Sequence, residues 1–342
     1  MTKRTFRWFL KVVFSGMLAL VVLHVFCLFY YNLPIHFSGE EGATDYIWES
    51  NFSYSNLTEG YGRGKTNNEG YVNPFDYADG METDILLMGS SHMEAFQLKM
   101  DESAAAQLRR LCPGNSVYNL GTSGHDFLVC ANNLSSAVKK YQPKKFVVVE
   151  TAAIHFSEEA IGAVLEGTAQ RIPSYSDGLL GMLQRNKYFC LLYKQLLARP
   201  VLINPPANPF ADKAAEVVKQ EPKKQADLEI SESMYALLQK MKKDVEVSGA
   251  ELIIVYHPFL SVRPDASAAA SVNRVQAQLF SEACQELGIR YLNMADRFLE
   301  EYEKNHVLPH GFFNSSVGNG HLNRYGHAMI AEELCSIISE VE

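Results

Sequence analysis

Cysteine is scarce in this sequence, with six residues among 342, and no two of them form a Cys-x-x-Cys pair. Cys27 lies in a long apolar run, and the others are scattered at Cys112, Cys130, Cys190, Cys284 and Cys335. A chain with so open a cysteine pattern is neither a disulfide-stapled miniature domain nor a zinc finger. We expect buried free thiols at these positions rather than disulfides.

A metal-ligand pattern is missing as well. His306 and His310 are four residues apart, but Pro309 between them breaks the helix that would align their rings. The sequence therefore predicts no metal and no cofactor.

Positive charge is in short supply, since 31 Lys and Arg face 39 Asp and Glu, a net charge of −8. Four of the basic residues and none of the acidic ones fall in residues 1–11, so residues 12–342 carry 27 against 39, or −12. Such a surface repels nucleic acid and does not bind anionic lipid by charge. Neutral sugars, zwitterionic polymers or another membrane protein are the partners that this charge favours.

Formal charge is absent from residues 12–33, which are apolar apart from the titratable His24 and a few small polar residues. A helix of this length measures about 33 Å, enough to cross the hydrocarbon core of a bilayer. Because residues 1–11 are basic, the positive-inside rule predicts a single-pass cell-membrane anchor with a cytoplasmic N-terminus and an extracytoplasmic C-terminal domain. A cleavable signal peptide is the competing interpretation, but bulky residues follow the run where small ones should lie.

The remaining chain divides into two parts. Residues 34–80 are rich in Gly, Asn, Ser and Tyr without a clear period, which predicts a stalk or irregular wrap. Residues 81–342 alternate short apolar runs with helical stretches, apart from an interruption at 155–230 that we interpret as an insertion over the ligand-bearing edge. The predicted strands are 84–88, 116–120, 145–150, 251–256 and 290–293, and the predicted helices are 101–112, 125–141, 232–248, 268–287 and 323–340. This alternation predicts an α/β domain with a mostly parallel five-stranded sheet and helices on both faces.

Polar residues follow the predicted strands, at the edge where open α/β sheets bind ligands. Gly-Ser-Ser-His (89–92) follows the first strand, and Asn-Leu-Gly-Thr-Ser-Gly-His (119–125) follows the second. A serine attacks a carbonyl when a base takes its proton and donors hold the oxyanion. Ser91 can supply the hydroxyl, His321 the base, and the N–H groups of Gly121 and Ser91 the oxyanion hole. A plain helix cap made by the two serines is the alternative.

These stretches, together with Gly-His-Leu-Asn-Arg-Tyr-Gly-His at 320–327, resemble the ordered sequence blocks of the SGNH (GDSL-type) hydrolases. The resemblance implies a flavodoxin-like three-layer α/β/α fold, with Ser91 as nucleophile, His321 as catalytic base and Gly121 in the oxyanion hole. Weaker candidates for substrate contacts are His92, His125, Thr151 and His257.

The sequence departs from the family pattern at three places. Ser90 stands where the family has Asp before the nucleophile, as in membrane-anchored relatives that handle acyl groups of the cell envelope. The third block lacks its oxyanion Asn, which leaves Glu150 or Thr151 in that place. The acid that normally lies three residues before the base is Gly318, which leaves a Ser–His dyad. A dyad predicts a weaker enzyme, because the acid orients the imidazole.

The resemblance implies a membrane-anchored, extracytoplasmic serine esterase or O-acyltransferase that acts on acyl groups, acetyl foremost, of a cell-envelope glycan. Its partners would be the acylated glycan or acyl donor and a multispanning membrane acyl exporter. The alternative belongs to another class: a catalytically inactive SGNH-like protein that binds a glycan or acts as a scaffold in an envelope-polymer complex. The altered blocks favour that alternative.

Overall fold

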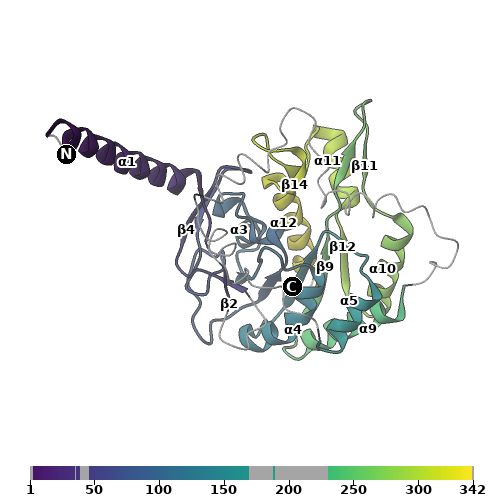
Figure 1. Cartoon of the computed structure of the whole chain (residues 1–342). Coiled ribbons are helices and arrows are strands. Elements are labelled where there is room, and N and C mark those ends of the chain that lie inside the picture. Colours follow the sequence, from purple (N-terminus) through teal and green to yellow (C-terminus); the bar gives the residue numbers. More distant parts are fainter. Residues whose placement is uncertain (1–2, 35, 39–45, 169–187, 189–229, 341–342) are drawn as a thin grey trace.

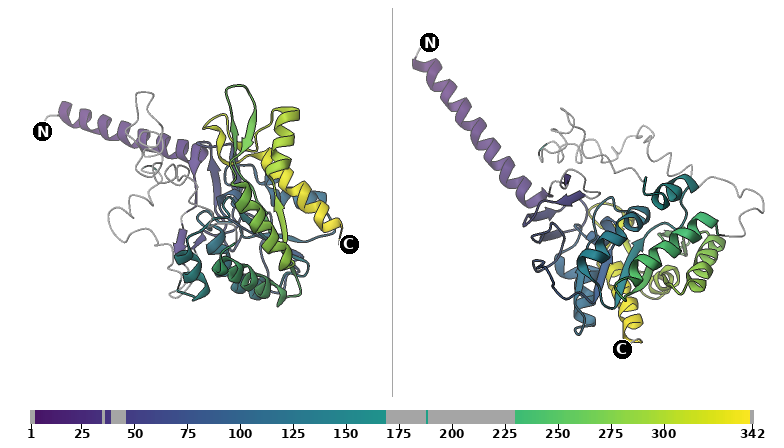
Figure 2. Two further views of the ribbon diagram at one scale, coloured as in Figure 1. Left: turned by 90° about the vertical axis from the view of Figure 1, so that its right-hand side faces the viewer. Right: turned by 90° about the horizontal axis from the view of Figure 1, so that it is seen from below.

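The computed structural model describes residues 3–34, 36–38, 46–168, 188 and 230–340, and Figure 1 shows their arrangement. One long helix, α1 (Lys3–Tyr30), projects clear of a body in which helices surround a sheet (Figures 1 and 2). Its 28 residues have a mean hydropathy of 2.6 over the most apolar window, so α1 has the length and composition to cross a membrane. The predicted single apolar span is therefore present, although the helix begins and ends earlier than 12–33.

The wrap, residues 34–80, is more regular than the sequence predicts. Its strands are β1 (Tyr31–Asn32, continuous with α1), β2 (His36–Ser38), β3 (Tyr46–Trp48), β4 (Ser53–Asn56) and β5 (Gly62–Lys65). β1, β4 and β5 form one small antiparallel sheet, and β2 pairs with β3. Trp48 and Tyr54 pack on Phe96 from the main domain, which fastens the wrap beside the first strand end of that domain.

The main sheet confirms the predicted fold class. Its spatial order is β7 (Val117–Asn119), β6 (Ile85–Met88), β8 (Phe146–Thr151), β9 (Glu251–Tyr256) and β12 (Arg290–Asn293). All four pairings are parallel. When the five strands are numbered by their position in the chain, their spatial order is 2-1-3-4-5, the flavodoxin-like arrangement. β8 is buried along its whole length and β9 beyond its first residue, as expected of strands covered on both faces.

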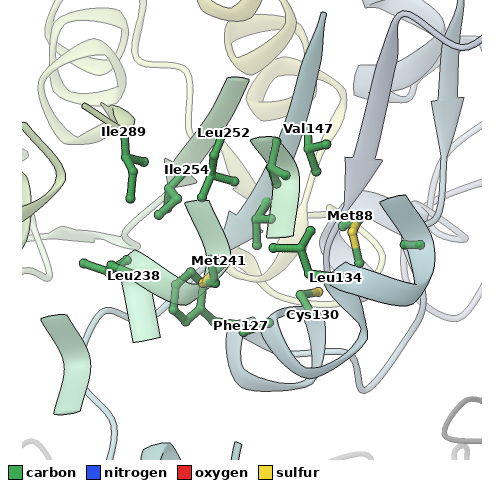
Figure 3. Close-up of a cluster of buried hydrophobic side chains, with 14 of the residues drawn as sticks. Met88, Phe127, Cys130, Leu134, Val147, Leu238, Met241, Leu252, Ile254 and Ile289 are labelled. Atoms are coloured by element: carbon green, nitrogen blue, oxygen red, sulfur yellow. The ribbon is translucent and has the colours of Figure 1, made fainter. Parts of the chain in front are cut away.

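Helices cover both faces of the sheet. One face carries α4 (Phe127–Tyr141), α5 (Glu158–Leu165), α9 (Glu232–Glu246) and α10 (Arg274–Glu286), and the other carries α3 (Ala104–Leu111), α11 (Ala295–Asn305) and α12 (Arg324–Ser339). Figure 3 shows the first core, where Leu134 and Met241 meet Ile254 of the sheet. Side chains alternate between the two cores along each strand, so Leu86 joins the first and Leu87 the second.

Several predicted boundaries need correction. The predicted helix 268–287 begins instead as β11 (Ala268–Ala270), paired with β10 (Leu260–Val262), and only then becomes α10. The Ala-Ser run there has no apolar period, so pairing with a neighbouring strand outweighs the helix propensity of alanine. α5, at the start of the predicted insertion, places Ile161 and Val164 in the first core. The rest of 155–230 lies almost wholly outside the described residues, and the predicted lid lies there too.

The expectation of free thiols is wrong for one pair. Cys112 and Cys335 form a disulfide with a Cα–Cα distance of 6.0 Å, which joins the end of α3 to α12. The two residues are 223 positions apart, so their proximity follows only from the packing of α3 beside α12. Cys27, Cys130 and Cys284 are buried and form no disulfide, as expected, and Cys190 lies outside the described residues.

Candidate functional site

The candidate site lies where the sheet order reverses, between β6 and β8. Open α/β sheets bind ligands at this switch point, outside the carboxyl ends of the strands. β6 ends at Met88, and Gly89 turns the chain into the short helix α2 (Ser91–Glu94). A Cβ on Gly89 would lie 2.5 Å from Oε2 of Glu150 on β8. Only glycine therefore allows the turn to pass so close to the neighbouring strand.

The two adjacent serines have different surroundings. Ser90 is the N-cap of α2, and its Oγ accepts the N–H of His92 at 3.3 Å and donates to Glu150 at 3.0 Å. Ser91 is the first residue of α2, and its Oγ lies 2.9 Å from Nε2 of His321. The capping alternative thus describes Ser90, while Ser91 has the geometry of a nucleophile beside its base.

His321 has a carboxylate partner that the sequence analysis missed. Its Nδ1 lies 2.9 Å from Oε2 of Glu59, although the angle falls short of an aligned hydrogen bond. The backbone N–H of His321 donates to the other oxygen, Oε1, at 3.0 Å. A proton on Nδ1 faces the carboxylate, which leaves the Nε2 lone pair to accept the hydroxyl of Ser91. Ser91, His321 and Glu59 therefore lie in the order of a Ser–His–acid triad, with glutamate in the place of the acid.

Ser91 and His321 lie in contact as the sequence predicts, and Glu59 adds a carboxylate beside His321 that the dyad prediction did not include. Glu59 comes from the wrap, whereas His321 lies on β14 (Val317–Leu322), a strand paired with β13 (His310–Gly311). The carboxylate beside His321 comes from the wrap and not from the position three residues before the histidine. The glycine at that position, Gly318, therefore does not leave His321 without a carboxylate neighbour. Gly320 keeps the path open, since a Cβ there would lie 2.5 Å from Glu59 Oε1 and its φ is +98°. The Gly-rich surroundings of Glu59 carry no local signal of catalysis.

Of the two predicted oxyanion donors, one is engaged elsewhere. The N–H of Gly121 donates to Oδ1 of Asn119 at 2.9 Å. A Cβ on Gly121 would lie 2.4 Å from the backbone nitrogen of Glu94, so close packing against α2 explains this glycine. Ser91 N–H has no intrahelical acceptor, because it is the first residue of its helix. It is the oxyanion donor that this conformation leaves free.

Glu150 stands where the family's third block has its oxyanion Asn, but its contacts are those of a structural residue. Its carboxylate is fully buried and accepts the N–H of Ser90 at 2.8 Å, while Oε1 lies 2.5 Å from Nε2 of His257. Burial raises the pKa of Glu150, but the charge and hydrogen bond of His257 outweigh it and lower that pKa to about 2. A permanently ionised carboxylate cannot donate to an oxyanion. Glu150 instead holds the turn that carries Ser91.

A cluster of imidazoles lies behind this turn. Ring nitrogens of His92, His257 and His310 come within 4.8 Å of one another, a spacing that suits a metal ion. Nδ1 of His92, however, accepts the N–H of Leu322 at 3.1 Å, so its neutral ring carries the proton on Nε2 and has no lone pair to offer. His257 Nδ1 and His310 Nε2 are hydrogen-bonded to each other at 3.3 Å, so one of them carries the proton and at most one lone pair remains, fewer than the three protein ligands of a catalytic zinc. The cluster is better described as a hydrogen-bonded support.

The predicted substrate-contact residues are all partly or fully enclosed. Burial lowers the pKa of His92 well below its usual range and that of His125 to about 4, so both rings are neutral. Thr151 accepts the N–H of Ala153 at 3.1 Å, and His257 is completely buried. These positions suit residues that shape the site from behind rather than residues that touch a substrate.

Glu94 is a second buried carboxyl that the sequence analysis did not single out. It accepts hydrogen bonds from Nε1 of Trp48 in the wrap and from the N–H of Ser123 at 2.9 Å. Burial raises the pKa of Glu94 to about 7, against the hydrogen bonds from Ser123 and Trp48, which lower it. Glu94 follows Ser91 on α2, so it ties the nucleophile helix to the wrap that carries Glu59.

Several solved structures are similar to this chain at low sequence identity. A G-D-S-L family lipolytic protein from Desulfitobacterium hafniense DCB-2 is 12% identical over 75% of this chain and 99% of its own, with a TM-score of 0.39. The esterase EstA from Pseudoalteromonas sp. is 13% identical over 75% and 96%, with a TM-score of 0.38. The acetyl xylan esterase AlAXEase is 10% identical over 74% and 98%, with a TM-score of 0.40.

No protein-family model and no curated protein matches the chain. TM-scores below 0.5 carry no information about activity, so the chemistry has to come from the residues of this chain. Three of the neighbours in structure, from Desulfitobacterium hafniense DCB-2, Veillonella parvula DSM 2008 and Parabacteroides merdae ATCC 43184, are described as G-D-S-L family or GDSL-like proteins.

Proposed function

We propose that this protein is a membrane-anchored, extracytoplasmic serine esterase or O-acyltransferase that acts on acyl groups, acetyl foremost, of a cell-envelope glycan. The observation that carries the proposal is the contact of Ser91 Oγ with His321 Nε2, 2.9 Å, in line with the 2.9 Å approach of His321 Nδ1 to Glu59. His321 and Glu59 side chains are about a quarter exposed, so the triad is open to a substrate.

The geometry supports acyl transfer in two steps. Ser91 Oγ attacks the acyl carbonyl while its proton passes to His321 Nε2, and Glu59 stabilises the imidazolium that forms. The N–H of Ser91 donates to the oxyanion. The alcohol leaves with the proton from His321, and an acyl-serine remains. Water or a sugar hydroxyl, deprotonated by His321, then takes the acyl group, which makes the reaction a hydrolysis or a transfer.

The proposed esterase is tested on the full-length chain in detergent. We expect covalent labelling by a fluorophosphonate, and release of acetate from p-nitrophenyl acetate and from O-acetylated oligosaccharides, because the triad is assembled without any ligand. Adding an unacetylated sugar acceptor separates the two reactions: a transferase moves the acetyl group to it. A chain that neither labels nor turns over any of these esters would be the inactive glycan-binding or scaffold protein instead.

The extracytoplasmic location is supported by α1 with its basic flank and by the Cys112–Cys335 disulfide, since structural disulfides persist in oxidising compartments. We expect this disulfide to be intact in cells that are lysed in denaturant with an alkylating reagent. Cys130 and Cys284 should be alkylated at once, whereas Cys112 and Cys335 should react only after reduction.

Loss of the disulfide should also destabilise the domain. By loop-closure entropy, a crosslink over 223 residues stabilises the fold by up to about 5 kcal/mol. We therefore expect Cys112→Ser to lower the thermal midpoint by many degrees, while Cys130→Ser, at a buried free thiol, costs less. Quantitative alkylation of Cys112 and Cys335 without reductant would contradict both the disulfide and its compartment.

A further inference from the structure

A groove of about 520 Å³ is lined by residues that lie close to Glu59 and His321 in the chain, and its volume is typical of small-molecule sites. The wrap, the loop after α2, the β13–β14 hairpin and the start of α12 form its walls. Its aromatic members are Tyr61, Phe312, Phe313 and Tyr325. Its polar members are Gln97, Lys99, Glu102, Asn323 and Arg324. We call this site the aromatic groove.

The aromatic groove is continuous with the catalytic residues along the chain. Tyr61 follows the triad acid Glu59 by two residues, and Asn323 follows the base His321 by two residues. Two residues of extended chain span about 7 Å, so the backbones of these two lining residues lie within about 7 Å of the backbones of Glu59 and His321. The N–H of Tyr61 donates to the carbonyl of Gln97 at 3.0 Å, which closes the wall between the wrap and the loop after α2.

The aromatic rings of the groove are unusually exposed. Phe313 is 95% exposed, Tyr61 59% and Tyr325 44%. Large aromatic side chains on a soluble surface cost solvation, and when they gather at a hollow they mark a binding site. The guanidinium of Arg324 lies 4.7 Å from the ring centre of Tyr325 and donates to its hydroxyl, so this ring is held in place before any ligand arrives.

We propose that the aromatic groove binds the sugar portion of the substrate, an uncharged or mildly anionic oligosaccharide, and so sets the glycan preference of the triad. This inference rests on the proposed function, because it assigns the residues that hold the glycan in that reaction. Faces of aromatic rings are negative and attract the C–H bonds of a sugar ring, while the hydroxyls need donors and acceptors at its rim. The groove offers both.

The composition of the groove argues against an acyl chain as occupant. Leu98 is its one aliphatic member, and a hydrocarbon tail would remove water from the charged side chains of Lys99, Glu102 and Arg324 without replacing their hydrogen bonds. The groove is lined by two basic residues, Lys99 and Arg324, and one acidic residue, Glu102. It therefore carries a net positive charge, although the chain as a whole is negatively charged. That charge suits hydroxyls and occasional anionic groups of an envelope glycan.

The test compares two esters on the same variants. In Tyr61→Ala/Phe313→Ala, we expect the KM for O-acetylated chito-oligosaccharides to rise about tenfold, with kcat/KM for p-nitrophenyl acetate within twofold of wild type, because the small ester does not reach the groove. Val317→Ala serves as control, since Val317 is exposed on the same hairpin but does not line the groove. Equal losses on both esters, or a loss confined to long-chain p-nitrophenyl esters, would overturn the proposal.

A binding measurement separates this inference from the proposed function. Calorimetric titration of the Ser91→Ala chain with unacetylated chito-oligosaccharides and xylo-oligosaccharides needs no catalysis. Binding of either sugar that is lost in Ser91→Ala/Tyr61→Ala/Phe313→Ala supports the groove even if no ester is turned over. Binding that persists unchanged in the triple variant, or absence of binding to both sugars, overturns the groove while leaving the triad chemistry untouched.

Discussion

Ser91→Ala should abolish fluorophosphonate labelling and lower acetyl-ester turnover by on the order of 10⁴- to 10⁶-fold, the range for loss of a serine nucleophile. The reason is the single hydroxyl that faces His321, since Ser90 Oγ is directed to Glu150 and the N–H of His92. The matched control is Ser90→Ala, which loses these two supporting hydrogen bonds but keeps the nucleophile. It should still label, with a far smaller drop in rate.

The base gives a second comparison for the same experiment. His321→Ala should cost on the order of 10²- to 10⁴-fold, and the double variant with Ser91→Ala should be little worse than Ser91→Ala alone, because the two residues act as a unit. Mass spectrometry of the labelled peptide identifies the modified serine. Wild-type labelling and rate in Ser91→Ala would show that both serines are helix caps.

Glu59→Gln should lower kcat on the order of 10⁴-fold with little change in KM. The amide keeps the shape of the side chain and an acceptor for the N–H of His321, but it removes the charge that stabilises the imidazolium. Glu82→Gln is the control, since Glu82 is an exposed glutamate paired with Lys144. Turnover measured on p-nitrophenyl acetate reports the effect without the groove.

A related variant tests whether a carboxylate at residue 318, three residues before His321, can act as the acid. Gly318→Asp should not raise the activity of the wild-type chain, because Glu59 already occupies Nδ1 of His321. It should also destabilise the hairpin, since Gly318 has a φ of +79° and a Cβ there would lie 3.2 Å from Leu308 Cδ1. A wild-type rate in Glu59→Gln, or a gain in Gly318→Asp, would return the site to a dyad.

Local pattern was enough to predict the sheet. β8 and β9 are continuous apolar runs because helices cover both their faces, and this signal lies within six residues. The same holds for the nucleophile turn, where Gly89 and Ser91 follow β6 directly. The helix predicted at 268–287 failed at its start, because alanine carries no information on which face is buried.

Features that depend on distant chain segments could not be read from the sequence. Glu59 meets His321 across 262 residues, and Cys112 meets Cys335 across 223. Neither contact has a local sequence signal, because each depends on how the wrap or the last helix packs against the main domain. The engagement of Gly121 by Asn119 is equally invisible, because it depends on how closely the loop approaches α2.

The site residues come from the wrap, from α2 and from β14, so they are synthesised at different times. Synthesis runs from the N-terminus, so Glu59 and Ser91 are made long before His321, which precedes only the final helix. The growing chain therefore carries Ser91 without its histidine partner until residue 321 has been added. In the proposed mechanism, attack on an ester has to wait for the strand that carries His321, so a chain truncated before that residue has the serine without its base.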